Sequence, residues 1–169
     1  ALPIYDLLAG AVIAGNQLLA KQLTDTLITH GQVLDNFSAW LLIRSLKTLH
    51  LRMARHNENG QYLAKKLLNV AGITSVKYAG VGGMISFYLA KGYDVNRFLT
   101  RLQLASFAES LGGPETLITI PAIQTHHDMT IEKREALGIT DQLVRVSAGL
   151  ENKLDIFEDI EQAVVGAKL

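Results

Sequence analysis

A single arginine interrupts an apolar stretch near the C-terminus, Leu143-Val-Arg-Val-Ser-Ala-Gly149. The apolar residues around Arg145 predict a β-strand. Burying a cation in such a strand costs free energy unless an anion faces it, and a guanidinium grips a carboxylate or phosphate through two parallel hydrogen bonds. The partner of Arg145 is therefore either a structural carboxylate, with Asp141 and Glu151 as candidates, or an anionic ligand. Spacing alone favours the structural pair.

A second segment, Phe107-Ala-Glu-Ser-Leu-Gly-Gly113, offers groups that suit the same anion. Its glycines loosen the backbone, and its N–H groups and the Ser110 hydroxyl can donate hydrogen bonds. A hydrolase that uses Ser110 as nucleophile is a poor alternative, because the Gly-x-Ser-x-Gly elbow is missing. Metal binding by His126, His127 and Asp128 is not predicted either, since neighbouring side chains on extended backbone point to opposite faces.

Composition is that of an ordinary globular domain. The chain has 169 residues, 49% hydrophobic and 19% charged, with zero formal net charge and no cysteine. The charge balance indicates neither a nucleic-acid nor an anionic-membrane partner. No apolar run has the length of a membrane span, and the N-terminus lacks a signal-peptide pattern. Absence of cysteine excludes disulfides and thiolate metal sites and fits a cytoplasmic enzyme.

The elements that must position Arg145 can be read from periodicity. Residues 74–78 and 84–89 are predicted strands joined by the short connection Ala79-Gly-Val-Gly-Gly83. Helices are expected from Asp94, as N-cap, to about Leu102, and after the N-cap Asn152. Residues 130–138 read as a charged turn or short helix ending at Gly138. The chain is thus predicted to form an α/β two-layer domain with a small, mainly antiparallel sheet and helices on one face.

The N-terminal third is organised differently. Residues 9–15 read as a short buried strand, and Lys21 lies on an amphipathic helix that Asn16 can cap. Residues 37–68 have a helical pattern with a possible break at Asn59-Gly60, so a bend or two helices are expected. Residues 1–5 fit neither this pattern nor the one that follows, and we predict that they are foreign to the gene.

Three motifs in order, Ala108-Glu-Ser-Leu-Gly-Gly113, Ile120-Pro-Ala-Ile-Gln-Thr-His126 and Gly138-Ile-Thr-Asp-Gln-Leu-Val-Arg-Val-Ser-Ala-Gly-Leu-Glu151, resemble the C-terminal part of the pyridoxal-phosphate (PLP) enzymes of Cys/Met metabolism. The resemblance runs from about Asp6 to Ala167. It implies the C-terminal domain of a fold-type-I, aminotransferase-like enzyme, preceded by a long linking helix. Residues 6–56 would be the end of the cofactor domain with that helix, and residues 57–169 the small C-terminal domain.

The resemblance also implies a set of substrate-binding residues. The position of Arg145 clamps the substrate α-carboxylate, and that of Ser110 helps through its backbone. Thr125 lines the distal substrate pocket, and Leu111 belongs to the same set. Glu109 matches a position at which the γ-acting cystathionine enzymes resemble one another in having Glu, which favours cystathionine γ-synthase or γ-lyase.

The implied parent is a PLP-dependent lyase or transferase of transsulfuration that acts on an amino acid such as cystathionine or a homoserine ester. Family members are usually homotetramers. The lysine that holds the cofactor precedes Asp6 in the family and is absent here, and Lys21 reads as a solvated helix lysine. The chain alone is therefore expected to be inactive. The alternative is a non-catalytic α/β domain for association or for binding small carboxylates.

The connection at residues 79–83 departs from the family. Relatives are expected to carry roughly twenty more residues between the two strands, so the short connection calls for an explanation.

Overall fold

The computed structural model describes residues 8–169, so the interpretation of residues 1–5 lies outside the described residues. The chain forms two compact units, Ile4–Leu49 and a unit that comprises His50–Leu169. The assignment of residues 6–56 to a cofactor domain and of 57–169 to a C-terminal domain stays a prediction. Among residues 8–169, no helix combines the length and the apolar character that crossing a membrane requires.

The first unit contains α1 (Gln17–His30) and α2 (Asn36–Leu46). The Asn16 side chain accepts a hydrogen bond from the N–H of Leu19 at 2.9 Å, which confirms it as the N-cap of α1. The strand predicted at residues 9–15 is wrong, because this segment forms no strand and pairs with no strand of the described residues. A strand is stabilised by its ladder, and local pattern cannot supply the partner.

The helical stretch from residue 37 onward forms two helices, but the predicted break is misplaced. The interruption falls at Lys47-Thr48, and α3 (Leu49–Leu67) runs without interruption through Asn59 and Gly60. Glycine is required at position 60 for a packing reason, since a Cβ there would clash with the carbonyl oxygen of Gly82. The glycine thus marks a close approach between α3 and the connection at residues 79–83.

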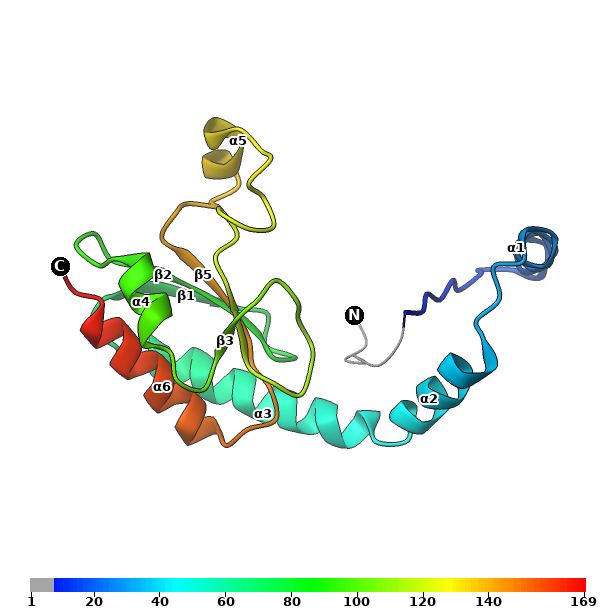
Figure 1. Cartoon of the computed structure of the whole chain (residues 1–169), viewed down its shortest axis with the longest axis horizontal. Coiled ribbons are helices and arrows are strands. Elements are labelled where there is room, and N and C mark those ends of the chain that lie inside the picture. Colours follow the sequence, from blue (N-terminus) through cyan, green and yellow to red (C-terminus); the bar gives the residue numbers. More distant parts are fainter. Residues whose placement is uncertain (1–7) are drawn as a thin grey trace. The chain divides into compact units, whose positions relative to one another are not determined.

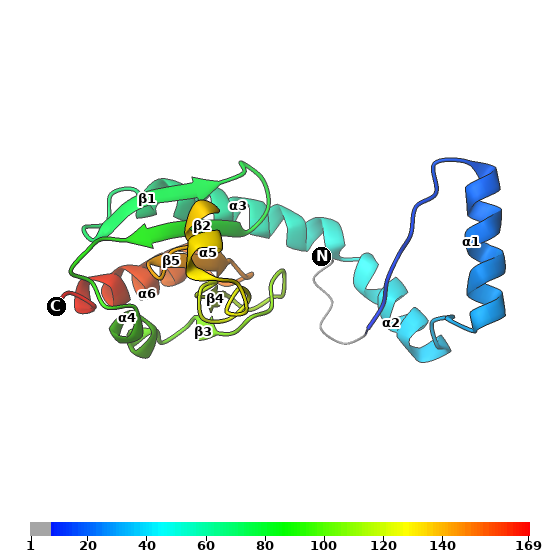
Figure 2. The ribbon, with the colours of Figure 1, turned by 90° about the horizontal axis from the view of Figure 1, so that it is seen from above.

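The second unit is built on a five-stranded sheet with the order β1-β2-β5-β4-β3 (Figures 1 and 2). All neighbours are antiparallel except β3 and β4, which are parallel. The sheet is therefore mainly antiparallel, as predicted. Its strands are β1 (Ile73–Tyr78), β2 (Met84–Leu89), β3 (Ser106–Phe107), β4 (Leu117–Thr119) and β5 (Leu143–Ser147).

One face of the sheet carries the core. Alternate residues of β2 are buried, as is every residue of β5 except Arg145, and Phe87 and Val144 pair in register on this face. Helices α3, α4 (Val95–Arg101) and α6 (Lys153–Gly166) cover it with apolar side chains, which confirms the two-layer prediction. Asp94 and Asn152 cap α4 and α6, as predicted. The fully buried apolar side chains of these three helices are Leu63, Leu67, Phe98, Ile156, Ile160, Ala163 and Val164.

The other face lies on the side of α5 (Ile131–Ala136), opposite α3 and α6 (Figure 1). The short helix predicted in residues 130–138 is therefore confirmed. The hydroxyl of Tyr88 on β2 donates to the carbonyl of Gly138 at 2.7 Å, which ties the segment after α5 to the sheet.

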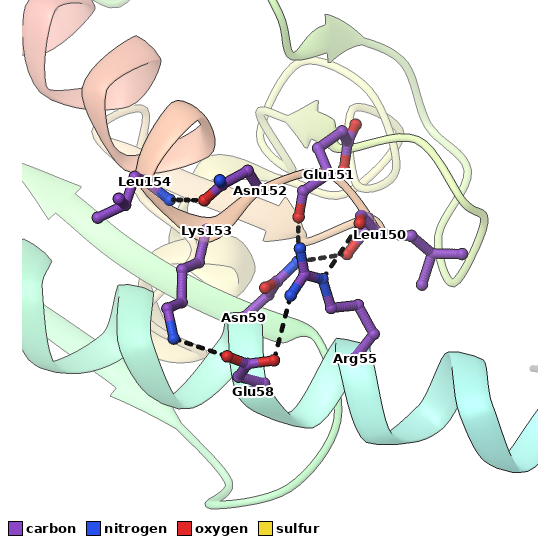
Figure 3. Close-up of polar contacts among 9 residues, drawn as sticks. Arg55, Glu58, Asn59, Leu150, Glu151, Asn152, Lys153 and Leu154 are labelled. Carbon is purple, nitrogen blue, oxygen red and sulfur yellow. Dashed lines mark hydrogen bonds and ion pairs between the residues drawn. The ribbon is translucent and has the colours of Figure 1, made fainter.

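Polar contacts attach α3 to the turn between β5 and α6 (Figure 3). The Asn59 amide donates to the carbonyls of Gly149 at 2.9 Å and Glu151 at 3.0 Å, and Arg55 Nε donates to that of Leu150 at 3.2 Å. Successive carbonyls of the turn thus have donors from one helix, which fixes the end of the strand that carries Arg145.

Candidate functional site

Arg145 lies on the sheet face opposite the helical layer. In register, Ser86 of β2 is its neighbour on one side and Thr119 of β4 is its neighbour on the other. Its own neighbours Val144 and Val146 point into the core and are fully buried. Alternation along β5 therefore explains how a charged residue sits in an apolar strand without entering the core.

The guanidinium of Arg145 is held at one nitrogen. Nη2 donates to the backbone carbonyl of Glu109 at 2.8 Å and to the hydroxyl of Thr119 at 2.9 Å. The structure thus joins two of the predicted site residues, Arg145 and Glu109, through the backbone of the second. Thr119, which sequence reasoning missed, completes the arrangement.

No carboxylate of residues 8–169 forms an ion pair with Arg145. Asp141 instead lies 3.6 Å from the guanidinium of Arg134. Glu151 accepts hydrogen bonds from the N–H and the hydroxyl of Thr116 at 2.7 and 2.8 Å. The alternative of a structural pair with Asp141 or Glu151 is therefore wrong, because both carboxylates are engaged elsewhere.

The electrostatic setting of Arg145 disfavours its charge. Burial lowers the pKa of the guanidinium below its ordinary value, and the nearby Glu109 carboxylate offsets part of this by raising it. The guanidinium nevertheless stays charged at neutral pH, since arginine begins from a very high pKa. A desolvated cation of this kind attracts an anion more strongly than a solvated one.

The loop that follows Glu109 lies against the same strand. The N–H of Gly112 donates to the hydroxyl of Ser147 at 2.7 Å, and Gly112 has a φ of 76°, which favours glycine. The N–H groups of Ser110 and Leu111 donate to no acceptor among the described residues. The N–H groups of Ser110 and Leu111 therefore lie in the loop that contacts the strand of Arg145. Like the Nε and Nη1 hydrogens of Arg145, they are available to a ligand.

A cavity of ≈ 160 Å³ adjoins this loop. His56 on α3 lines it and is buried, with Nδ1 2.7 Å from the carbonyl oxygen of Ala148. The cavity is lined by Met53, His56, Gly82, Gly83, Met84, Leu111, Gly112, Ser147 and Ala148.

Thr125 forms no hydrogen bond with Arg145, Thr119 or Glu109. Its hydroxyl lies 2.8 Å from Nδ1 of His126, and the side chain is exposed. His127 contacts the carbonyl of Gln124 at 2.7 Å. The role of Thr125 in a distal pocket stays a prediction, as do those of Ser110, Leu111 and the Glu109 side chain.

Several lysines of residues 8–169 have contacts of their own. Lys21, the lysine nearest the predicted cofactor position in sequence, pairs with Asp25 at 2.6 Å on the exposed surface of α1. Lys66, Lys77 and Lys153 contact tyrosine rings or Glu58. None of these contacts involves the Arg145 cluster.

Comparison with known proteins identifies the family of this chain. Residues 5–165 match the family of Cys/Met metabolism PLP-dependent enzymes. The chain is 45% identical to a cystathionine γ-synthase/O-acetylhomoserine (thiol)-lyase of Bacillus subtilis over 96% of this chain and 44% of the relative. It is 38% identical to a cystathionine γ-lyase of the same organism over 94% of this chain and 46% of the relative. The chain therefore spans less than half the length of these relatives.

Solved structures give the same result. The cystathionine γ-synthase of Xanthomonas oryzae, solved with aminoacrylate and cysteine, superimposes with a TM-score of 0.83 at 34% identity. The overlap covers 92% of this chain and 44% of that one. The likeness confirms that the fold is that of the C-terminal part of such an enzyme.

The lengths of the alignments explain the short connection at residues 79–83. The alignment with the B. subtilis synthase runs over 163 residues and covers 96% of this chain, which leaves no room for twenty extra residues. The alignment with the γ-lyase runs over 175 residues yet covers 94% of the chain, about 159 residues, so about 16 positions of that relative have no counterpart here. The expectation of about twenty more residues is thus wrong for the synthase, whereas the γ-lyase has room for an insertion of about 16 residues.

The motifs, the fold and the matched span agree. The chain belongs to the Cys/Met metabolism PLP-dependent enzyme family.

Proposed function

We propose that this chain carries the substrate-carboxylate clamp of a PLP-dependent transsulfuration enzyme, with Arg145 binding the α-carboxylate of the amino-acid substrate. The observation that supports this is a partly desolvated guanidinium that two neutral oxygens hold in place and with which no carboxylate of residues 8–169 pairs. Burial of an unpaired cation costs free energy, and binding an anion recovers it.

The loop after Glu109 adds the second half of the clamp. The N–H groups of Ser110 and Leu111 lie directly after the carbonyl that accepts from Arg145, so a carboxylate at the guanidinium can also accept from this loop. The bond from Gly112 to Ser147 ties the loop to β5. The loop is therefore held in a fixed position relative to Arg145.

The substrate proposed is cystathionine or a homoserine ester, in a γ-replacement or γ-elimination. Glu109 places a carboxylate beside the clamp, where it can pair with a distal ammonium or position an attacking partner. Two cystathionine γ-synthase relatives at 45% identity support the synthase type, because their alignments leave no room for a long insertion. Thr125 is proposed to line the distal part of the substrate pocket.

When bound in the parent enzyme, PLP supplies an electron sink for this chemistry. The residues of this chain bind and orient the substrate so that the reacting bond is correctly placed. We propose that the cofactor lysine lies outside this chain and that the chain alone has no turnover. We further propose that the parent is a cytoplasmic homotetramer.

Binding of L-homoserine to the purified, ¹⁵N-labelled chain tests the clamp. Its decarboxylated counterpart, 3-aminopropan-1-ol, is the matched probe, because it differs only by the carboxylate. We expect L-homoserine to shift the amide signals of Ser110 and Leu111 with a Kd on the order of 1 mM, about 4 kcal/mol of binding free energy, while 3-aminopropan-1-ol leaves them unchanged.

Arg145→Gln should abolish these shifts, whereas Arg44→Gln, which removes an exposed arginine of α2, should not. Equal shifts with both probes, or retained binding in Arg145→Gln, would contradict the carboxylate clamp. Turnover of cystathionine by this chain in the presence of PLP would contradict the proposed division of the active site.

A further inference from the structure

We propose that Thr119 is a positioning residue for Arg145, whose hydroxyl fixes which hydrogens of the guanidinium remain available to an anion. This inference rests on the proposed carboxylate clamp. Thr119 lies opposite Arg145 in the register of β4 and β5, and its hydroxyl is 2.9 Å from Nη2 of Arg145.

The hydroxyl of Thr119 has a defined polarity. It donates its only hydrogen to the carbonyl of Ala108 at 2.6 Å, so towards Arg145 it can act only as an acceptor. Donation to Ala108 also makes the oxygen a better acceptor, because hydrogen bonds in a chain polarise one another. Thr119 is 1% exposed, so water does not compete for this oxygen.

Both hydrogens of Nη2 are then used. One goes to Thr119 Oγ1 and the other to the carbonyl of Glu109 at 2.8 Å. A guanidinium has five N–H groups in a rigid plane, so holding one nitrogen at two points fixes the orientation of the whole plane. The hydrogens on Nε and Nη1 remain, and they donate to no group of residues 8–169.

The same contacts connect the clamp to the loop. Ala108 and Glu109 precede the Ser110 and Leu111 N–H groups directly, and their carbonyls contact Thr119 and Arg145 respectively. Thr119 therefore sets the distance between the two halves of the proposed carboxylate site. Valine has the shape of threonine but neither accepts nor donates, whereas serine retains the hydroxyl, so this pair of substitutions isolates the hydrogen bond.

The first measurement needs no ligand. In the ¹H–¹⁵N spectrum of the chain, slow rotation of the Arg145 guanidinium should give resolved Nη hydrogens that exchange slowly with water. We expect these signals to merge and their hydrogens to exchange faster with water in Thr119→Val. In Thr119→Ser the resolved, slowly exchanging signals should be preserved. Thr74→Val is the control for folding, because that hydroxyl also donates to a sheet carbonyl, that of Tyr88 at 3.3 Å, but lies away from Arg145.

The second measurement is L-homoserine binding. Thr119→Val should weaken it about tenfold, the effect of about 1.4 kcal/mol, while Thr119→Ser should stay within about twofold of the starting chain. If the Arg145 signals of Thr119→Val and Thr119→Ser are alike, the positioning role is overturned even where homoserine binds. If no form binds homoserine but the signals differ as expected, the carboxylate clamp fails and the positioning of Arg145 stands.

Discussion

Glu151 and Thr116 form a two-point contact in which one carboxylate accepts both the N–H and the hydroxyl of the same residue, at 2.7 and 2.8 Å. The Thr116 oxygen in turn accepts the N–H of Gly149 at 2.9 Å. The start of β4 is thereby joined to the turn after β5. Carbonyls of the same turn accept hydrogen bonds from Asn59 of α3 (Figure 3). Both strands that carry the Arg145 cluster are fixed at this point.

Glu151→Gln should therefore destabilise the second unit by about 1–3 kcal/mol, because an amide can accept from the N–H of Thr116 but its NH₂ cannot accept from the hydroxyl. The urea midpoint of unfolding measures this. Glu158→Gln is the matched control, since Glu158 is exposed on the next helix, and its midpoint should be unchanged. A midpoint for Glu151→Gln equal to that of the control would contradict the two-point contact.

Gly60→Ala should destabilise the chain although alanine is the better helix former. The added Cβ meets the carbonyl oxygen of Gly82 and the ring of Tyr78, and overpacking of this kind costs about 1–3 kcal/mol against a gain of about 1 kcal/mol from helix propensity. Thermal unfolding monitored by circular dichroism measures the net effect. Gly10→Ala, where a Cβ meets nothing within 4 Å, is the control. A higher Tm for Gly60→Ala would mean that the close approach of α3 is not as described.

Asp159 joins α6 to the segment after α4. Its carboxylate accepts the N–H groups of three consecutive residues, Gln103, Leu104 and Ala105, at 2.8, 3.0 and 2.9 Å. Asp159→Asn should cost about 1–3 kcal/mol of unfolding free energy, because one acceptor oxygen becomes a donor facing a backbone N–H. Amide hydrogen exchange should localise the loss of protection to residues 103–105. Uniform protection across the unit would show that this contact is dispensable.

Glu58 supplies a pH-dependent contribution to stability. Its hydrogen bond with Lys153, assisted by that with Arg55, lowers the pKa of the carboxyl below its ordinary value of 4.5 (Figure 3). A lowered folded-state pKa means that the stabilisation is complete above the unfolded-state pKa and is lost as the pH falls through the folded-state value. The difference in urea midpoint between the starting chain and Glu58→Gln should thus be present at pH 7 and vanish at the acid end of the titration.

Exposed carboxylates without an ion pair provide the reference for that experiment. Glu135→Gln should give the same midpoint as the starting chain at both ends of the pH range. A difference for Glu58→Gln that persists unchanged into acid would contradict the assigned cause. Addition of salt at pH 7 should reduce the difference, because this contact is at the surface.

PLP should form no stoichiometric, borohydride-trappable adduct with this chain. Lys21 lies on an exposed helix and pairs with Asp25, so nothing sets it apart as a cofactor lysine. Absorbance near the imine band and mass spectrometry after borohydride measure this. Lys21→Ala should behave as the starting chain does. A single adduct that disappears in Lys21→Ala would restore Lys21 as a functional residue.

Local patterns were sufficient for much of the second unit. The alternating burial of β2 and the caps Asp94 and Asn152 depend on neighbours within a few residues, which the sequence displays directly. The order of the three motifs also identified the family, because motif order is a property of the sequence itself. The residue type of Arg145 likewise indicated an anionic partner, although spacing alone favoured a structural carboxylate.

Other features depend on residues that are far apart in sequence. The strand expected at residues 9–15 lacked a partner, and Gly60, which suggested a helix break, instead accommodates the carbonyl of Gly82. Both errors arose because a local pattern does not show what packs against it.

The contacts of Arg145 also depend on residues that are far apart in sequence. Its hydrogen bonds reach Thr119 and Glu109, which are 26 and 36 residues away in sequence. Strand register brings Thr119 opposite Arg145, and a one-residue slip would turn every side chain of β4 to the other face. The sequence by itself therefore determined the family and placed an arginine within an apolar strand. Only the tertiary structure decided which oxygens hold the guanidinium, because those oxygens are positioned by sheet pairing.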